Sequence, residues 1–100
     1  MSAVALAALA EPNRQRMLRL VRDEPRSVGE IAAQFDISQQ AVSHHLQVLK
    51  DAGLVEVRQD GQRRLYEVRP EGLASVEELL EQFWPRHLQK LKHAVESQHG

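Results

Sequence analysis

The sequence predicts one mainly helical domain over residues 1–100, with a single two-stranded β-hairpin before the last helix. Three observations predict this fold class. Apolar residues recur at helical spacing through most of the chain. After Gly53 the spacing becomes that of two strands, and Asp60-Gly61 between them is a strong signal for a two-residue hairpin turn. Hydrophobic residues make up 42% and charged residues 27% of the chain, which is typical of a globular protein with a modest core.

The composition excludes several classes of protein. The chain contains no cysteine, which excludes disulfide bonds, thiolate metal sites and cysteine nucleophiles. Residues 1–10 are apolar but carry no basic residue, and no segment approaches the roughly 18 apolar residues of a membrane span. We therefore expect a cytoplasmic protein with no membrane association. The net charge of −1 does not by itself favour nucleic acid, because DNA-binding domains are usually basic.

Two helices are predicted before Pro25. Residues 2–10 are rich in alanine, which is a strong helix former. Pro12 suits the first turn of a second helix that runs to about Arg22, and Pro25 ends it. The side chains of the second helix that we expect to face the core are Met17, Leu20 and Val21.

A helix-turn-helix unit is predicted over residues 27–52. Ser27 followed three residues later by Glu30 has the form of a capping box and opens a third helix. Ser38 can cap a fourth helix that runs from Gln39 to Ala52. The residues of the third helix expected to face the core are Ile31, Ala32 and Phe35.

Residues 54–69 are predicted to form the hairpin. Gly53 can supply the left-handed residue that closes the preceding helix. Pairing outward from Asp60-Gly61 sets Gln59 opposite Gln62, Arg58 opposite Arg63, and Val57 opposite Arg64. Like charges directly opposite each other repel. Three interpretations remain open for the two arginines: an anion such as a phosphate lies between them, they diverge into water, or the register differs.

A long final helix is predicted over about residues 72–96, with Pro85 expected to kink or break it. Its apolar stripe is too wide for one short chain to bury, and exposure would leave a large apolar patch. We therefore predict a homodimer that buries this stripe together with residues 1–10. The predicted interface residues are Val4, Leu6, Leu9, Val76, Leu80, Phe83, Trp84, Leu88, Leu91 and Val95.

The fourth helix separates a polar face from an apolar face. At about 100° per residue, its hydrogen-bonding side chains share one arc and its aliphatic side chains share the opposite arc. Side chains of these types read base edges in the major groove, and glutamine can pair with adenine through two hydrogen bonds. The alternative is an ordinary solvated face, but the preceding capped helix and the following hairpin favour double-stranded DNA. The predicted DNA contacts are Ser38, Gln39, Gln40, Ser43, His44, Gln47, Lys50, Arg58, Arg63 and Arg64.

Two stretches of the chain, ALAEPNRQRMLRLV and SVGEIAAQFDISQQAVSHHLQVLKDAGLVEVRQDGQRRLYEV, resemble the ArsR-type family of winged helix-turn-helix transcriptional repressors. The resemblance covers about residues 7–69 and is most specific from Ser38 to Val55. It implies a symmetric homodimer that binds an inverted-repeat operator, with the helix from Gln39 as recognition helix and the hairpin as wing. Members of this family dimerise through their first and last helices, which matches the unburied stripe.

The chain departs from the metal-sensing members of that family. Those members carry a cysteine pair in the helix that corresponds to residues 27–35, and this chain has none. A second family site uses acidic and histidine residues of the last helix. His93 and Glu96 fit its latter half, but Leu80 and Gln82 occupy the earlier positions. The chain thus resembles the cysteine-free, non-metal-sensing branch, often autorepressors, and we expect no cofactor. A metal-responsive repressor with a histidine and carboxylate site in the last helix is the alternative.

The histidines and serines of the fourth helix do not indicate a catalytic or metal site. His44 and His45 point about 100° apart on a helix, so one ion cannot easily bind both. His45 falls on the apolar face, where we expect a core histidine with a hydrogen-bond partner. Ser43 and His44 diverge in the same way, and no glycine-rich phosphate loop or nucleophile elbow occurs. We therefore expect no enzyme. A winged helix that binds protein would lack the polar face, and the sequence identifies no effector.

Overall fold

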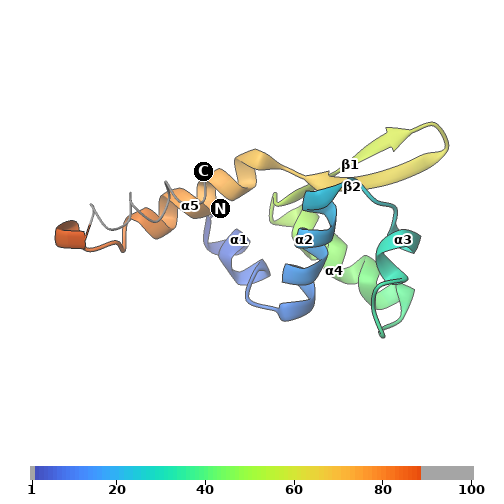
Figure 1. Cartoon of the computed structure of the whole chain (residues 1–100), viewed down its shortest axis with the longest axis horizontal. Helices are drawn as coiled ribbons and strands as arrows, with labels where there is room; N and C mark the ends of the chain where they lie inside the picture. Colours follow the sequence, from blue (N-terminus) through green and yellow to red (C-terminus); the bar gives the residue numbers. More distant parts are fainter. Residues whose placement is uncertain (1, 89–100) are drawn as a thin grey trace.

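The computed structural model describes residues 2–88. The elements are α1 (Ser2–Ala8), α2 (Pro12–Asp23), α3 (Val28–Ala32), α4 (Gln39–Asp51), β1 (Val55–Asp60), β2 (Arg63–Val68), α5 (Pro70–Glu81) and the short 3-10 helix η1 (Arg86–Leu88). Figure 1 shows α1 to α4 gathered into one body, with the hairpin projecting from one end and α5 from the other. The predicted fold class, mainly helical with a two-stranded antiparallel sheet, is confirmed.

The starts of the central helices follow from their capping residues. At α3 the Ser27 hydroxyl accepts from the Glu30 backbone N–H at 3.2 Å, and the Glu30 carboxylate accepts from the Ser27 N–H at 2.9 Å. At α4 the Ser38 hydroxyl accepts from the Ala41 N–H at 3.0 Å. Each cap satisfies backbone donors that the first helical turn leaves without partners. Both helices therefore begin where the sequence predicts.

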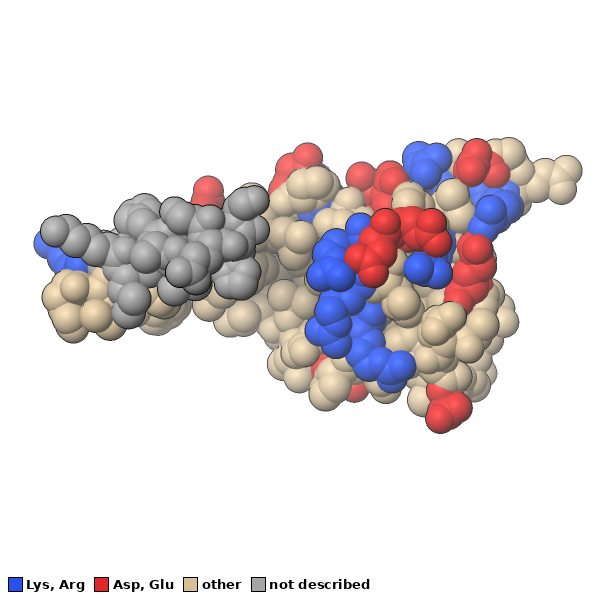
Figure 2. All heavy atoms as spheres, viewed as in Figure 1, with Lys and Arg blue, Asp and Glu red and all other residues tan. Residues whose placement is uncertain are grey.

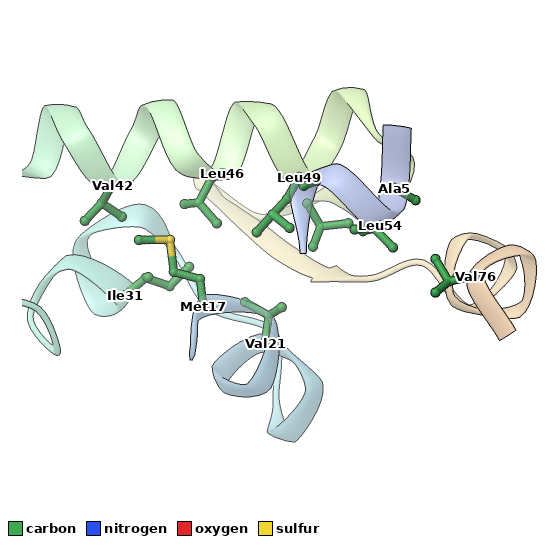
Figure 3. Close-up of a cluster of buried hydrophobic side chains, with 11 residues drawn as sticks. Ala5, Met17, Val21, Ile31, Val42, Leu46, Leu49, Leu54 and Val76 are labelled. Carbon is green, nitrogen blue, oxygen red and sulfur yellow. The ribbon is translucent and has the colours of Figure 1, made fainter. Parts of the chain in front are cut away.

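The core lies under α4 (Figure 3). Figure 3 shows Val42, Leu46 and Leu49 pointing from α4 into the cluster, with Leu49 beside Leu54, and all three side chains are fully buried. Burying an aliphatic side chain of this size contributes about 1.5–3 kcal/mol. The apolar face of α4 is thus packed against α2 and α3. Its opposite, polar face must therefore point to the solvent. The other buried members of this core cluster are Ala5, Ala8, Met17, Val21, Ile31, Leu54, Val55 and Val76.

The hairpin turn lies one residue later in the chain than predicted, which shifts every cross-strand partner by two residues. Asp60 lies opposite Arg63, so the loop residues are Gly61 and Gln62. Gly61 has a φ of 65°, and Gln62 does not have a positive φ. A type II′ turn has this combination, with positive φ at its first central position only. The glycine therefore takes the first central position of the turn instead of the second. As a result Arg58 faces Leu65 and not Arg63, and the predicted Arg58–Arg63 pair is wrong.

The final helix is shorter than predicted. It begins at Pro70, two residues before Gly72, because proline is favoured at the first helical position. It ends at Glu81, and the N–H groups of Gln82 and Phe83 donate three residues back, to Leu79 and Leu80. Pro85 has no N–H and disfavours helical backbone before it. Of the two outcomes predicted at Pro85, a kink or a break, the described chain therefore shows a break, with α5 already ended at Glu81; residues 89–96 of the predicted helix lie outside the described residues.

Among the helices of residues 2–88, none has the length and apolarity that crossing a membrane requires. The last part of the predicted final helix, which includes Leu91, His93, Val95 and Glu96, lies outside the described residues.

Candidate nucleic-acid interface

One face of α4 is exposed along its whole length. The predicted polar arc is exposed, whereas Val42, Leu46 and Leu49 are buried. This burial pattern matches the partition that helical geometry predicts. The exposed residues of the face are Gln39, Gln40, Ser43, His44, Gln47 and Lys50, with Ser38 exposed just before them.

The polar side chains on this face differ in their hydrogen bonds. The Gln47 amide donates to the Asp51 carboxylate at 2.7 Å, and the Ser38 hydroxyl is occupied by its cap. Within residues 2–88, the side chains of Gln39, Gln40 and Ser43 make no hydrogen bond. The free amides therefore lie in the first turn of α4, and a base could be bound there without breaking an existing contact.

His45 is held on the opposite side of the helix, as the sequence predicts for a core histidine. Its side chain is 18% exposed, and its Nδ1 lies 3.2 Å from Nη1 of Arg14. A guanidinium only donates, so a hydrogen bond forms here in the tautomer of His45 that leaves Nδ1 as the acceptor. Arg14 also donates from Nε to the Ala8 carbonyl at 2.7 Å. No sequence pattern predicted this cluster, which ties the end of α1 and the start of α2 to α4.

Glu11 completes the same cluster. Its carboxylate caps α2 by accepting from the Arg14 N–H at 3.0 Å and lies 3.7 Å from Nδ1 of His45. Desolvation acts to raise the pKa of Glu11. The backbone N–H groups of Arg14 and Asn13, with the charges of His45 and Arg14, outweigh it and hold this pKa below its usual value. Pro12 was the available sequence signal, because proline at the first helical position places Glu11 at the N-cap.

The three arginines of the hairpin are not equivalent. Arg58 contacts the Glu67 carboxylate at 3.3 Å, and Arg63 forms an ion pair with Glu30 of α3. Arg64 is exposed and has no ion pair within the described chain. The sequence predicts all three as DNA contacts. The structure brings two of them to carboxylates and leaves Arg64 as the hairpin arginine available to an external anion.

The Glu30 carboxylate serves two partners at once. The backbone N–H of Ser27, its hydroxyl and the Arg63 guanidinium hold the pKa of Glu30 below its usual value, against a smaller opposing effect of desolvation. The contribution of this carboxylate to stability is therefore present at neutral pH and is lost as pH falls through the lowered pKa. The ion pair joins the helix-turn-helix unit to the hairpin across 33 residues of sequence.

The predicted dimer residues divide into exposed and buried groups. Val76 is buried in its own chain, with 7% of its surface exposed, and Leu9 packs against the same core. Leu88 is half-buried, and Leu91 and Val95 lie outside the described residues. The remaining members form the exposed group: Val4 at 55%, Leu6 at 41%, Leu80 at 53%, Phe83 at 74% and Trp84 at 37%. Apolar exposure on the described chain is therefore concentrated on α1 and on α5 with the turn after it.

Within residues 2–88, no group of three or more histidine or acidic side chains is placed to hold a metal ion. The rings of His44 and His45 are tilted by 56° with their centroids 6.1 Å apart. His93 and Glu96, the half-site of the alternative hypothesis, lie outside the described residues.

A capped α3, a turn, an α4 with a polar exposed face and a following hairpin together define a winged helix-turn-helix DNA-binding protein. A family model described as a helix-turn-helix domain matches residues 9–58. The chain is 39% identical over 94 residues to the HTH-type transcriptional regulator Rv2034 of Mycobacterium tuberculosis, covering 94% of this chain and 88% of that protein. The chain belongs to the ArsR family of transcriptional regulators, and its function is regulation and not catalysis.

Two solved structures extend the comparison. The ArsR-like transcriptional regulator from Rhodococcus sp. RHA1 superposes with a TM-score of 0.76 at 28% identity, covering 93% of this chain and 91% of that one. The homodimeric winged helix-turn-helix DNA-binding domain of Mb0332 from Mycobacterium bovis superposes with a TM-score of 0.67 at 33% identity, covering 88% and 82%. The fold of the described chain is therefore that of known winged helix-turn-helix regulators.

Proposed function

We propose that this protein is a cytoplasmic transcriptional repressor that binds an inverted-repeat operator in double-stranded DNA as a homodimer. The observation that carries this proposal is the exposed polar face of α4, where the amides of Gln39 and Gln40 have no partner in the described chain. Side chains in the first turn of a recognition helix are the ones that reach base edges in the major groove. The family resemblance supports the repressor role.

The homodimer is supported by the exposed apolar residues of α1 and α5. Figure 1 shows α5 projecting away from the body, where Leu80 and Phe83 are half or more exposed. Burying a leucine or phenylalanine side chain stabilises a complex by about 1.5–3 kcal/mol. The similar Mb0332 domain is itself a homodimer. Two-fold symmetry then sets the two α4 helices on half-sites about one helical turn apart.

Selection from random duplex DNA with the purified protein tests this proposal. We expect enrichment of an inverted repeat whose half-site centres are about 10 base pairs apart, because the dimer presents α4 twice. Failure to enrich any sequence, with only salt-sensitive binding to all duplexes, would contradict sequence-specific recognition. Retention of no DNA at all would favour a winged helix that binds protein.

Replacing Arg64 with alanine is expected to weaken operator and scrambled duplex equally. We expect Arg64 to contact a phosphate, and phosphate contacts position a protein on DNA without reading its sequence. Removing one phosphate interaction flattens the slope of log K against log salt by about 0.9, so removing it from both half-sites flattens the slope by about two. Titrations at several salt concentrations measure this slope. An effect on operator preference alone would show that Arg64 reads sequence.

Arg63 provides the matched comparison. Because Arg63 already pairs with Glu30, Arg63→Ala should flatten the salt dependence less than Arg64→Ala. Glu30→Gln keeps a side-chain acceptor for the capping box but removes the charge that holds Arg63. This variant should tighten binding to both duplexes, and unchanged affinity would show that the ion pair does not compete with phosphate.

Divalent metals are expected to leave operator affinity unchanged. The chain has no cysteine, and Leu80 and Gln82 occupy two positions of the last-helix site where the family has ligands. Adding zinc or nickel ions during an operator titration is the measurement, with a chelator-treated sample as the control. A stoichiometric ion that changes affinity tenfold or more, about 1.4 kcal/mol, would establish the metal-responsive alternative.

A further inference from the structure

A pocket of about 400 Å³ lies outside the proposed DNA face, between α2, the end of β2 and the first turn of α5. Its apolar walls are formed by Leu9, Leu18, Val68 and Leu73. Arg19 and Arg22 line it from α2. The volume is within the range of sites that bind small organic molecules, about 300–1,000 Å³. This pocket has no part in the DNA contacts proposed above.

The basic residues at this pocket belong to the outer side of α2. Figure 3 shows Met17 and Val21 pointing from α2 toward the core. Arg19 and Arg22 are exposed and fall on the opposite arc at about 100° per residue. Figure 2 shows a band of basic residues running over α2 on this face of the molecule. An anionic ligand would therefore meet a favourable field as it approaches the pocket.

The polar side chains that line the pocket differ in whether they already have hydrogen-bond or ion-pair partners. The Gln15 amide donates to the Leu9 carbonyl at 2.6 Å, and Arg22 pairs with Asp23 at 2.9 Å. Arg19 has no ion pair or hydrogen bond within residues 2–88. A guanidinium binds a carboxylate through two parallel hydrogen bonds. Arg19 is thus the basic group at this pocket that has no partner within residues 2–88, and it lies beside an apolar wall.

We propose that this pocket binds a small organic carboxylate with an apolar tail, and that the bound ligand changes the affinity of the protein for its operator. The carboxylate pairs with Arg19, and the tail packs between Leu18, Val68 and Leu73. Val68 ends the second wing strand and Leu73 lies near the start of α5, so the ligand contacts the junction between the wing and the helix assigned to the dimer. The regulatory part of this proposal rests on the proposed DNA-binding function.

Calorimetric titration of the full chain with octanoate tests the site without DNA. We expect octanoate to bind, and octanamide, which has the same tail without the charge, to bind at least tenfold more weakly. Arg19→Gln should weaken octanoate binding by about tenfold, as expected for a charge-assisted pair of about 1.4 kcal/mol. Arg16→Gln is the matched control, because Arg16 lies on the same helix but does not line this pocket; it should change octanoate binding less than twofold.

Leu73→Gln supplies a second, independent variant, because Leu73 is 37% exposed and its replacement leaves the core intact. It should also weaken octanoate binding. The site is overturned if octanoate does not bind, if octanamide binds equally well, or if Arg16→Gln and Arg19→Gln have equal effects.

An operator titration with and without saturating octanoate tests the regulatory part. A change in operator affinity of fivefold or more, the lower end of typical coupling between sites, is expected in the wild type and not in Arg19→Gln. Unchanged affinity while calorimetry shows octanoate bound would overturn the effector role. Failure of the wild type to bind any selected DNA without octanoate would instead count against the proposed function, and calorimetry would still decide the pocket.

Discussion

Replacing Phe83 with aspartate is expected to convert the protein to a monomer at micromolar concentration and to weaken operator binding by about 10²–10⁴-fold. Phe83 is 74% exposed on the single chain, so a charge there costs the fold of one chain little. In a dimer the same charge would have to be buried without a partner. Operator affinity falls because joining two half-site contacts in one molecule raises the effective concentration of the second contact by factors of this size.

Analytical ultracentrifugation and operator titration measure the two effects together. Gln82→Asp is the matched control, because Gln82 is the exposed polar neighbour of Phe83 and is not one of the apolar residues assigned to the dimer interface. This control should remain dimeric. A wild-type chain that is monomeric, folded and fully competent for operator binding would refute the assignment of α1 and α5 to a dimer.

Replacing Gln40 with alanine is expected to cost about 1–3 kcal/mol at the operator and to leave binding to scrambled duplex nearly unchanged. The Gln40 side chain is exposed and makes no hydrogen bond in the described chain, so its amide is free to pair with a base edge. The substitution removes no hydrogen bond within the described chain. The folded stability of the protein should therefore be unaffected, which thermal unfolding checks.

Comparing Gln40→Ala with Arg64→Ala separates recognition of bases from contact with the phosphate backbone. The first should change the ratio of operator to scrambled affinity, and the second should change both affinities and the salt slope while keeping the ratio. If Gln40→Ala weakens both duplexes equally and Arg64→Ala alters the ratio, the assignment of the two roles is reversed.

The sequence predicted the helix-turn-helix unit well because its signals are local. Ser27, Glu30 and Ser38 act through hydrogen bonds to backbone groups three residues away. The faces of α4 follow from the spacing of its aliphatic residues alone. Such features require no knowledge of the rest of the chain.

The sequence did not predict features that depend on the type of turn or on contacts between residues far apart in the chain. Asp60-Gly61 predicted the hairpin but not its register, because either position of the turn can accommodate glycine with positive φ. The ion pair between Glu30 and Arg63 joins residues 33 positions apart. A Cβ on Gly72 would overlap the Gly53 carbonyl oxygen, so the packing of α5 against the start of the hairpin depends on an approach that no sequence pattern marks.

The two ends of α5 were predicted only approximately from the sequence. The sequence predicts Pro70 as the end of the strand, and it is also the first residue of α5. The sequence predicts a kink or a break at Pro85, and only the hydrogen bonds of Gln82 and Phe83 show that α5 has already ended before it. Proline marks a boundary in the sequence, but the neighbouring contacts decide how the boundary is built.

The exposed face of α4 can be tested directly because the chain has no cysteine. A single cysteine in place of Ser43 would lie on the proposed DNA face, and one in place of Asp23 would lie on the exposed outer side of α2. We predict that saturating operator duplex slows alkylation of Ser43→Cys by about tenfold or more, because a helix in the major groove is closed to solvent, and leaves the rate of Asp23→Cys unchanged. Equal alkylation of Ser43→Cys with and without bound operator would contradict the assignment of α4 as the recognition helix.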